Sequence, residues 1–133
     1  MNRLSALAVA LCVLASPAVS AGASWKQLSA DMYVDTSSMG RSFNSVYADV
    51  KYLYDKADAA RLQKTFTSKL APQHSIQRKN FYCNTMEIST SAYKYFAADG
   101  TVLATGSISS PKKTGVVPES RIEVVYDFVC QQR

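Results

Sequence analysis

Hydrophobic and polar residues alternate over much of the chain, and this alternation predicts a protein built mainly of β-strands. The clearest example runs from Phe43 to Tyr54, where nearly every second residue is apolar or aromatic. Successive side chains of a strand point to opposite faces, so this segment is predicted to be a long, half-buried strand. One face carries Val46, Ala48, Val50, Tyr52 and Tyr54, and the other carries Ser45, Asp49 and Lys51.

Six further segments have strand character. The last, over residues 121–130, is the most regular, because its even-numbered residues form one apolar face of an extended chain. The dipeptide Asp99-Gly100 predicts a type I′ hairpin turn. A polar turn is expected over residues 36–40, and a loop is expected over residues 110–120, which include two prolines. The further predicted strands cover residues 24–30, 32–35, 75–83, 85–98, 101–109 and 121–130.

Residues 55–70 break the alternation and predict one short helix. Asp55 can cap its N-terminus, and apolar residues follow at helical spacing. We expect the helix to pack one face on the sheet and to end before Pro72, because proline cannot continue a helix. The apolar residues at helical spacing are Ala59, Leu62 and Phe66.

Together these elements predict an α+β fold that is mainly β, with an antiparallel sheet of about six strands, one short helix packed on it and one disulfide. The chain has no internal repeat and no linker. Residues 22–133 are therefore predicted to form a single domain, which is long enough to bury one modest core.

The first 21 residues differ from the rest and are typical of a secretory signal peptide. Arg3 provides the basic start, residues 4–15 form an uncharged apolar run, and small residues follow. We expect cleavage after Ala21, or two residues later, so that the mature protein begins at Gly22 or Ser24. The apolar run is shorter than the roughly 20 residues that span a bilayer, so no transmembrane segment is predicted.

Cys12 raises the question of a lipid anchor. A bacterial lipoprotein has a small residue before its modified cysteine, whereas Leu11 stands there in this chain. Cys12 also lies inside the apolar run instead of closing it. We therefore predict an exported protein, periplasmic or secreted, with or without association with the cell surface, and not a lipoprotein.

Two cysteines remain in the mature chain, Cys83 and Cys130. An even number of cysteines in an exported protein predicts a disulfide, and two cysteines allow only one intramolecular pairing. Neither cysteine lies in a C-x-x-C motif, and no cluster of histidines accompanies them. The pair is therefore predicted to be structural and not to bind a metal.

The net charge bears on the kind of partner. The chain has 15 basic and 10 acidic residues, a net charge of +5, and without Arg3 the mature protein keeps about +4. This excess favours anionic partners mildly, such as acidic protein patches, acidic glycans or lipid headgroups, and it also fits an ordinary soluble surface. The charge forms no stripe and the chain is exported, so no nucleic-acid partner is predicted.

The sequence offers little that points to catalysis. Its only histidine is His74, and it contains no G-x-S-x-G elbow, no H-E-x-x-H helix and no glycine-rich phosphate loop. Its pairs of carboxylates have plain explanations as helix caps or surface residues. We therefore predict a protein that is not an enzyme and that uses neither a cofactor nor a metal.

Tyrosines and clustered basic residues are the candidates for binding. Tyrosine offers contact area and a hydroxyl at a low entropic cost, and it is also an ordinary filler of half-buried strand positions. A pair of lysines on a loop suits an acidic partner and is also ordinary in loops. Arg121 is expected to extend the patch formed by Lys112 and Lys113. The candidate partner-binding residues are Arg78, Lys79, Tyr93, Tyr95, Lys112, Lys113 and Arg121.

Short motifs follow one another in a distinctive order along the mature chain. They are Trp25, the YVDTSS stretch at 33–38, the strand at 46–54, a strand leading into Cys83, the hairpin at 95–102, the VPES step at 117–120 and a closing strand that ends at Val129-Cys130. This order resembles the surface-adhesin E-like family of Gram-negative bacteria over nearly the whole mature chain.

The resemblance implies a small antiparallel sheet with a helix, a bridge between Cys83 and Cys130, and adhesion to host matrix proteins or epithelium. Two departures are that the chain lacks the lipid-attachment motif found in some adhesins of the family and that the loop at 111–117 replaces an aromatic residue. The leading hypothesis is an exported, non-catalytic adhesin-like protein that binds host extracellular-matrix or cell-surface proteins. The alternative is a periplasmic accessory or inhibitor protein that binds another protein.

Overall fold

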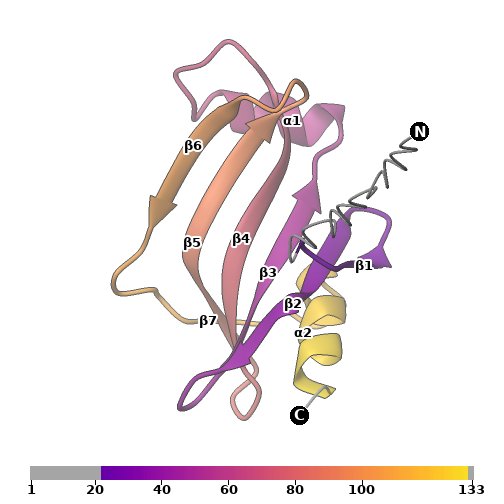
Figure 1. The fold of residues 1–133 in the computed structure, drawn as a ribbon, viewed down its shortest axis with the longest axis vertical. Coiled ribbons are helices and arrows are strands. Elements are labelled where there is room, and N and C mark those ends of the chain that lie inside the picture. The colour runs from indigo at the N-terminus through magenta and orange to yellow at the C-terminus, as the bar shows by residue number, and fades with distance from the viewer. Residues whose placement is uncertain (1–21, 132–133) are drawn as a thin grey trace, which may run out of the picture.

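The computed structural model describes residues 22–131, so the predicted signal peptide lies outside the described residues. Seven strands form one antiparallel sheet, and the first six lie side by side in chain order (Figure 1). The short seventh strand pairs with the part of β5 that β6 leaves free. The strands are β1 (Trp25–Ser29), β2 (Met32–Arg41), β3 (Val46–Leu53), β4 (Pro72–Tyr82), β5 (Glu87–Ala97), β6 (Val102–Ser107) and β7 (Thr114–Gly115).

Two helices accompany the sheet, α1 (Lys56–Gln63) and α2 (Arg121–Gln131). α2 packs on one face over β1 to β4, whereas α1 lies at one end of the strands (Figure 1). The predicted mainly β fold with an antiparallel sheet is therefore confirmed. The core between α2 and the sheet contains Met32, Val34, Ala48, Val50, Phe81, Val125, Tyr126 and Val129.

Residues 121–130, predicted to be the last strand, form α2 instead. The apolar residues of this segment fit the two-residue period of a strand and also the 3.6-residue period of a helix, because its three buried residues recur at helical spacing. Glu123 favours the helix, since its carboxylate lies in the first turn and accepts a hydrogen bond from the backbone N–H of Glu119. Val124, which a strand would bury beside Tyr126, is exposed.

The predicted helix over residues 55–70 is present only in its first half. Asp55 caps α1 as expected and accepts a hydrogen bond from the backbone N–H of Asp58 at 2.7 Å. The helix ends at Gln63, and the hydroxyl of Thr65 then donates to the carbonyl three residues earlier, which favours a turn. α1 has no buried residue, so the helix that packs on the sheet is α2 and not this one.

The polar turn expected over residues 36–40 is part of β2. The strand pairing shifts between Asp35 and Gly40, as at a β-bulge. The carboxylate of Asp35 accepts hydrogen bonds from the backbone N–H groups of Ser24 and Ser37. Burial alone would raise the pKa of Asp35. The hydroxyl of Ser37 and these backbone hydrogen bonds lower it instead.

The hairpin between β5 and β6 is present, but its turn is not of type I′. That turn requires a positive φ at both central residues, and only Gly100, at 88°, has one. The loop is longer, because Phe96 pairs with Val102 and the backbone N–H of Ala97 donates to the carbonyl of Thr101. Glycine is suited to the left-handed position at its end.

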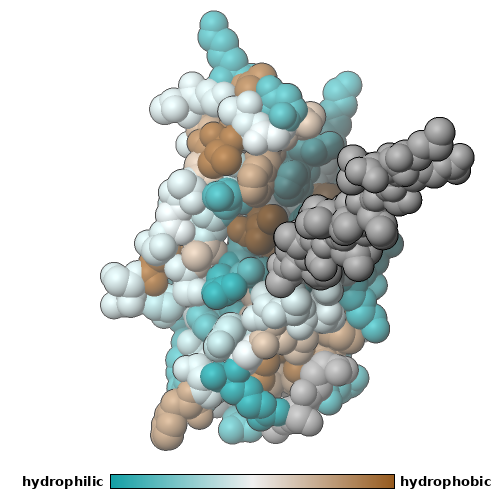
Figure 2. All heavy atoms as spheres, in the orientation of Figure 1, coloured by the Kyte–Doolittle hydropathy of each residue, from teal (hydrophilic) through white to brown (hydrophobic). Residues whose placement is uncertain are grey.

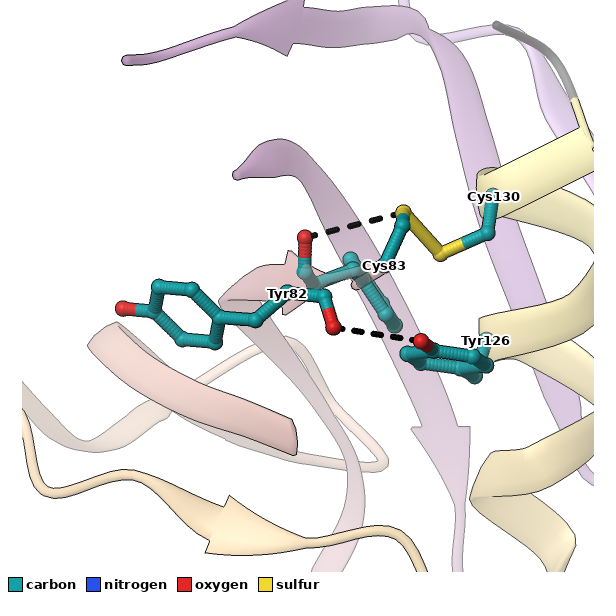
Figure 3. Close-up of a disulfide and its surroundings, with 5 residues drawn as sticks. Tyr82, Cys83, Tyr126 and Cys130 are labelled. Carbon is teal, nitrogen blue, oxygen red and sulfur yellow. Dashed lines mark hydrogen bonds between the residues drawn. A yellow bond between two sulfur atoms is a disulfide. The ribbon is translucent and has the colours of Figure 1, made fainter. Parts of the chain in front are cut away.

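The predicted disulfide between Cys83 and Cys130 is confirmed, with their Cα atoms 5.6 Å apart. It joins the end of β4 to α2 and not to a final strand (Figure 3). Beside it, the hydroxyl of Tyr126 donates to the carbonyl of Tyr82 at 3.1 Å. One covalent bond and one hydrogen bond therefore hold the helix against the end of this strand.

Candidate binding surfaces

α2 covers only part of its face of the sheet, and tyrosines occupy the neighbouring part. The core residue Met32 pairs with Tyr52, which pairs with Ser75, which pairs in turn with Tyr95. Paired residues of antiparallel strands point to the same face, so all four lie on the face that α2 covers. We name the neighbouring group the tyrosine–lysine cluster, and it consists of Tyr52, Tyr54, Phe66, Lys79, Tyr93 and Tyr95.

Tyr95 is the centre of the aromatic contacts in the tyrosine–lysine cluster. Its ring stacks on Tyr54 with the centroids 6.2 Å apart, meets Tyr93 edge-on at 6.0 Å, and contacts Phe66 at 5.1 Å. Tyr93 lies flat across Gly106 of β6, where an added Cβ would come within 2.6 Å of the tyrosine hydroxyl. The predicted pair of tyrosines therefore belongs to a larger, partly buried group.

Hydrogen bonds connect the tyrosines to polar side chains of β4. The hydroxyls of Tyr54 and Ser75 are 2.6 Å apart, and the side-chain amide of Gln77 donates to Ser75 at 3.1 Å. Burial raises the pKa of Tyr54 to about 12 and also raises the pKa of Tyr52. Both tyrosines are therefore neutral at physiological pH, and they add no negative charge to this surface.

Lys79 is the only cation of the tyrosine–lysine cluster. Its ammonium donates to the hydroxyl of Thr90 at 2.6 Å and lies 5.7 Å from the ring centroid of Tyr52. Burial lowers the pKa of Lys79 to about 8. No carboxylate within residues 22–131 forms an ion pair with it.

Arg78, the neighbour of Lys79 in the sequence, points to the opposite face of the sheet. Its guanidinium donates two hydrogen bonds to the carboxylate of Asp49, at 2.8 and 3.0 Å. This bond to Asp49 raises the pKa of Arg78. The predicted pair Arg78-Lys79 is thus divided between two faces. On the face of Arg78, a hollow of about 500 Å³ is lined by Asp49, Ile76, Arg78, Lys94 and Phe96, among others.

Arg121 and Lys113 do not form one patch. Arg121 makes an ion pair with Asp31, in the turn between β1 and β2, and Lys113 lies 4.3 Å above the ring of Tyr82. Tyr82 ends β4 beside the start of β3, whereas Asp31 accepts a hydrogen bond from Leu53 at the end of β3. The two cations are therefore separated by roughly 20 Å along that strand.

The pKa of Asp31 is lowered, and the ion pair with Arg121 contributes to this. Burial alone would raise its pKa, but hydrogen bonds from Arg121 and Ser29 lower it. The guanidinium of Arg121 has a raised pKa for the same reason. Arg121 is therefore already engaged at the start of α2.

The β2–β3 and β4–β5 turns extend from the same end of the sheet (Figure 1), because the start of β3 pairs with the end of β4. Phe43, at the tip of the first turn, is fully exposed, and Met86 of the second turn is also exposed. The loop that carries Lys112 and Lys113 leads into β7, which pairs with the start of β5 at this end. We name this surface the hairpin end, and it consists of Arg41, Phe43, Met86, Lys112 and Lys113.

Phe43 is not among the residues predicted to bind, because the alternating pattern places it at the start of a strand. The available signal was an apolar residue inside the otherwise polar run 41–45. Beside Phe43, a depression of about 150 Å³ is lined partly by Arg41, Asn44 and Asn84. Figure 2 shows scattered hydrophobic side chains and no continuous apolar patch on the face in view.

His74 has a structural environment. Its ring stacks on Phe96 with centroids 4.6 Å apart, and its pKa is lowered first by burial and then by the charge of Lys51. Over residues 22–131, no group of three or more histidine, cysteine or acidic side chains is placed to hold a metal ion. In the same part of the chain, no helix is long and apolar enough to cross a membrane.

Comparison with known proteins finds one matching family model and solved structures with a similar fold. The family model described as surface-adhesin protein E matches residues 22–131. Crystal form II of Haemophilus influenzae protein E is similar with a TM-score of 0.54 and 13% identity, over 77% of this chain and 81% of that one. Protein E from non-typeable H. influenzae is similar with a TM-score of 0.53 and 11% identity, over 87% and 81%. No curated protein matches.

Proposed function

Because the chain belongs to the surface-adhesin protein E family, we propose that it is an exported, non-catalytic adhesin-like protein that binds host extracellular-matrix or cell-surface proteins. Membership of this family supports an adhesin-like surface protein. The proposal adds the host protein as partner, residues 22–133 as the single mature domain and the hairpin end as the surface of contact.

The observation that supports this surface is the fully exposed ring of Phe43, at the same end of the sheet as cations that form no ion pair. Arg41 and Lys112 form no ion pair within residues 22–131. Aromatic residues and arginine dominate the energetic hot spots of protein interfaces. Covering the phenyl ring of Phe43 would contribute about 1.5–3 kcal/mol, and the neighbouring cations would accelerate association with an acidic partner.

The other predicted basic residues are poorer candidates for a first contact. Arg78 and Arg121 are already paired with carboxylates, so binding an acidic partner would require each of them to leave an existing partner. Lys79 is largely buried, as its pKa of about 8 reflects. The hairpin end therefore offers the free charges of the candidate set together with an exposed aromatic ring.

The test is binding of the mature protein to a panel of purified extracellular-matrix proteins. We expect Phe43→Ser to weaken binding at least tenfold, which corresponds to the loss of one buried ring. Val102→Ser is the matched control, since Val102 is an exposed apolar residue on β6, away from the hairpin end. If both variants bind like the wild type, the hairpin end is not the contact surface.

Export and display are tested separately in the native bacterium. Mass spectrometry of the exported protein should find an N-terminus at Gly22, or at Ser24 if the second site is cleaved. Protease added to intact cells should degrade an adhesin, because an adhesin must reach the outside. Complete protection of the folded protein would favour the periplasmic accessory role instead.

A further inference from the structure

We propose that the tyrosine–lysine cluster is a second binding site, which takes the carboxylate of an acidic peptide segment through Lys79. This proposal rests on the proposed function, because it assumes a protein as the partner. The second site lies on a different surface from the hairpin end. The hairpin end is beyond the start of β3, whereas the aromatic rings of the cluster lie around Tyr52 and Tyr54, at the other end of this strand.

The hydrogen bonds of Lys79 are incomplete. An ammonium has three donors, and the contacts within residues 22–131 are one hydrogen bond to Thr90 and a position above the ring of Tyr52. The ion pairs of this part of the chain involve Arg61, Arg78 and Arg121 instead. Lys79 is thus a largely buried cation with donors to spare and no anion.

Such a cation is unfavourable on its own. Removing a charge from water costs free energy unless an opposite charge or hydrogen bonds compensate for it. The lowered pKa of Lys79, about 8, reflects this cost. A ligand carboxylate would supply the missing charge in surroundings where an ion pair is stronger than in water.

The side chains around Lys79 suit one carboxylate on a short apolar stem. Ser75 and Gln77 continue along β4 from Lys79 on the same face, and Gln77 donates to Ser75. Tyr52 and Tyr54 border this polar row on the β3 side, and Tyr93 and Tyr95 border it on the β5 side. Glutamate would place its methylene groups against the rings and its carboxylate on the ammonium.

A peptide fits these surroundings better than an acidic glycan does. Sugar rings bind to aromatic faces that are free, whereas Tyr95 already contacts Tyr54, Tyr93 and Phe66. The cluster also has a single cation, which matches one acidic side chain better than the repeated charges of a glycosaminoglycan. The neutral tyrosines do not repel an incoming carboxylate, because burial raises the pKa values of Tyr52 and Tyr54.

The experiment titrates the mature protein with an acetylated and amidated hexaglutamate peptide and follows the side-chain NMR signals of Lys79. We expect saturable shifts, a higher pKa of Lys79 in the complex, and no binding of the matching hexaglutamine peptide. Lys79→Met should weaken hexaglutamate binding at least tenfold. Lys94→Met is the matched control, since Lys94 is exposed on the same sheet and lies above Phe96, and it should bind like the wild type.

Three results would overturn the proposal. They are no hexaglutamate binding by the wild type, equal binding by the Lys79→Met variant, and signal changes at Lys79 only with an oligosaccharide of repeating glucuronate units. Near-ultraviolet circular dichroism confirms that each variant is folded. Thr90→Val removes the hydroxyl that accepts a hydrogen bond from Lys79, so it is a second substitution that acts on the same ammonium independently of Lys79→Met. The matrix-binding assay with Phe43→Ser reports on the hairpin end alone, so failure of either idea is seen separately.

Discussion

One face of the sheet is covered in two different ways. Over β1 to β4 it is closed by α2, whose buried side chains Val125 and Val129 meet aliphatic residues of the strands. Farther along the same face, over β3 to β6, the covering consists of tyrosine side chains with hydroxyls, hydrogen bonds and the cation of Lys79.

The two halves differ in what their side chains contribute to stability. The α2 half buries apolar side chains and is linked to the end of β4 by a disulfide, so its residues contribute mainly to the free energy of unfolding. The tyrosine–lysine cluster contains the ammonium of Lys79, which has one hydrogen bond and no ion pair within residues 22–131, and such a desolvated charge is unfavourable for folding. Removing the disulfide from the α2 half and removing the charge of Lys79 from the cluster should therefore change stability in opposite directions.

The largest effect is expected from removing the disulfide of the α2 half. With a sequence separation of 47 between its cysteines, the chain-entropy model assigns the bond about 4 kcal/mol. The double variant Cys83→Ser, Cys130→Ser should lose about that much stability in urea denaturation, and it leaves no free thiol in the mature chain.

The control for this prediction is the wild type in reducing buffer, which should be destabilised by a similar amount. Peptide mapping without reduction should find Cys83 linked to Cys130 in the exported protein. A loss below about 1 kcal/mol would mean that α2 is held by its apolar contacts and that the bond adds little.

A change of opposite sign is expected in the tyrosine–lysine cluster. Lys79→Met removes a largely buried charge and keeps a similar shape, so at pH 7 it should stabilise the protein by about 1–2 kcal/mol. The pKa of Lys79 is about 8 in the folded protein and 10.5 as the ordinary value. Between these values the unfolded chain holds more protons, so the stability of the wild type should rise with pH over that range.

The measurement is the free energy of unfolding of both proteins between pH 7 and pH 10. The wild type should become more stable across that range, and the difference between the two proteins should shrink as Lys79 loses its proton. Lys94→Met is again the control and should keep the wild-type pH dependence. A variant that is less stable than the wild type at every pH would show that Lys79 supports the fold.

Most of the strands and the disulfide could be predicted from the sequence, because alternation is a local signal and two cysteines allow only one intramolecular pairing, whereas β7 lies in the predicted loop and the second half of β2 in the predicted turn. The alternation around Val50 and the cap at Asp55 identified β3 and the start of α1. α2 was misassigned because residues 121–130 are apolar at both the strand and the helix period. Which of the two forms depends on the sheet that buries Val125 and Val129, and no local pattern contains that information.

The candidate binding residues were predicted by type and not by arrangement. Lys79 and Tyr95 were both named, yet only strand pairing brings them to one face with Tyr52. Arg78 and Arg121 were grouped with free cations because their partners, Asp49 and Asp31, are distant in sequence. Ion pairs of this kind depend on the tertiary fold, so a sequence shows the charges but not which of them are already neutralised.

The smallest change in stability is expected at the hairpin end, outside both halves. Replacing Lys112 and Lys113 by alanine should alter the free energy of unfolding by less than about 1 kcal/mol, because Lys113 loses only one exposed contact with the ring of Tyr82. The same double variant should bind an acidic partner more weakly. Its association rate should also depend less on salt, because exposed charges act through a field that is screened within about 8 Å at physiological ionic strength.

A salt titration of affinity and association rate, for wild type and double variant on whichever matrix protein binds, decides how the lysines act. Convergence of the two proteins at high salt would show that the lysines steer the partner and that Phe43 holds it. A constant difference at every salt concentration would mean direct contacts that survive screening. Equal affinities and parallel salt curves would mean that the lysines only solvate their loop, and recognition would then move to the tyrosine–lysine cluster, with Tyr93 and Tyr95 as the residues to replace next.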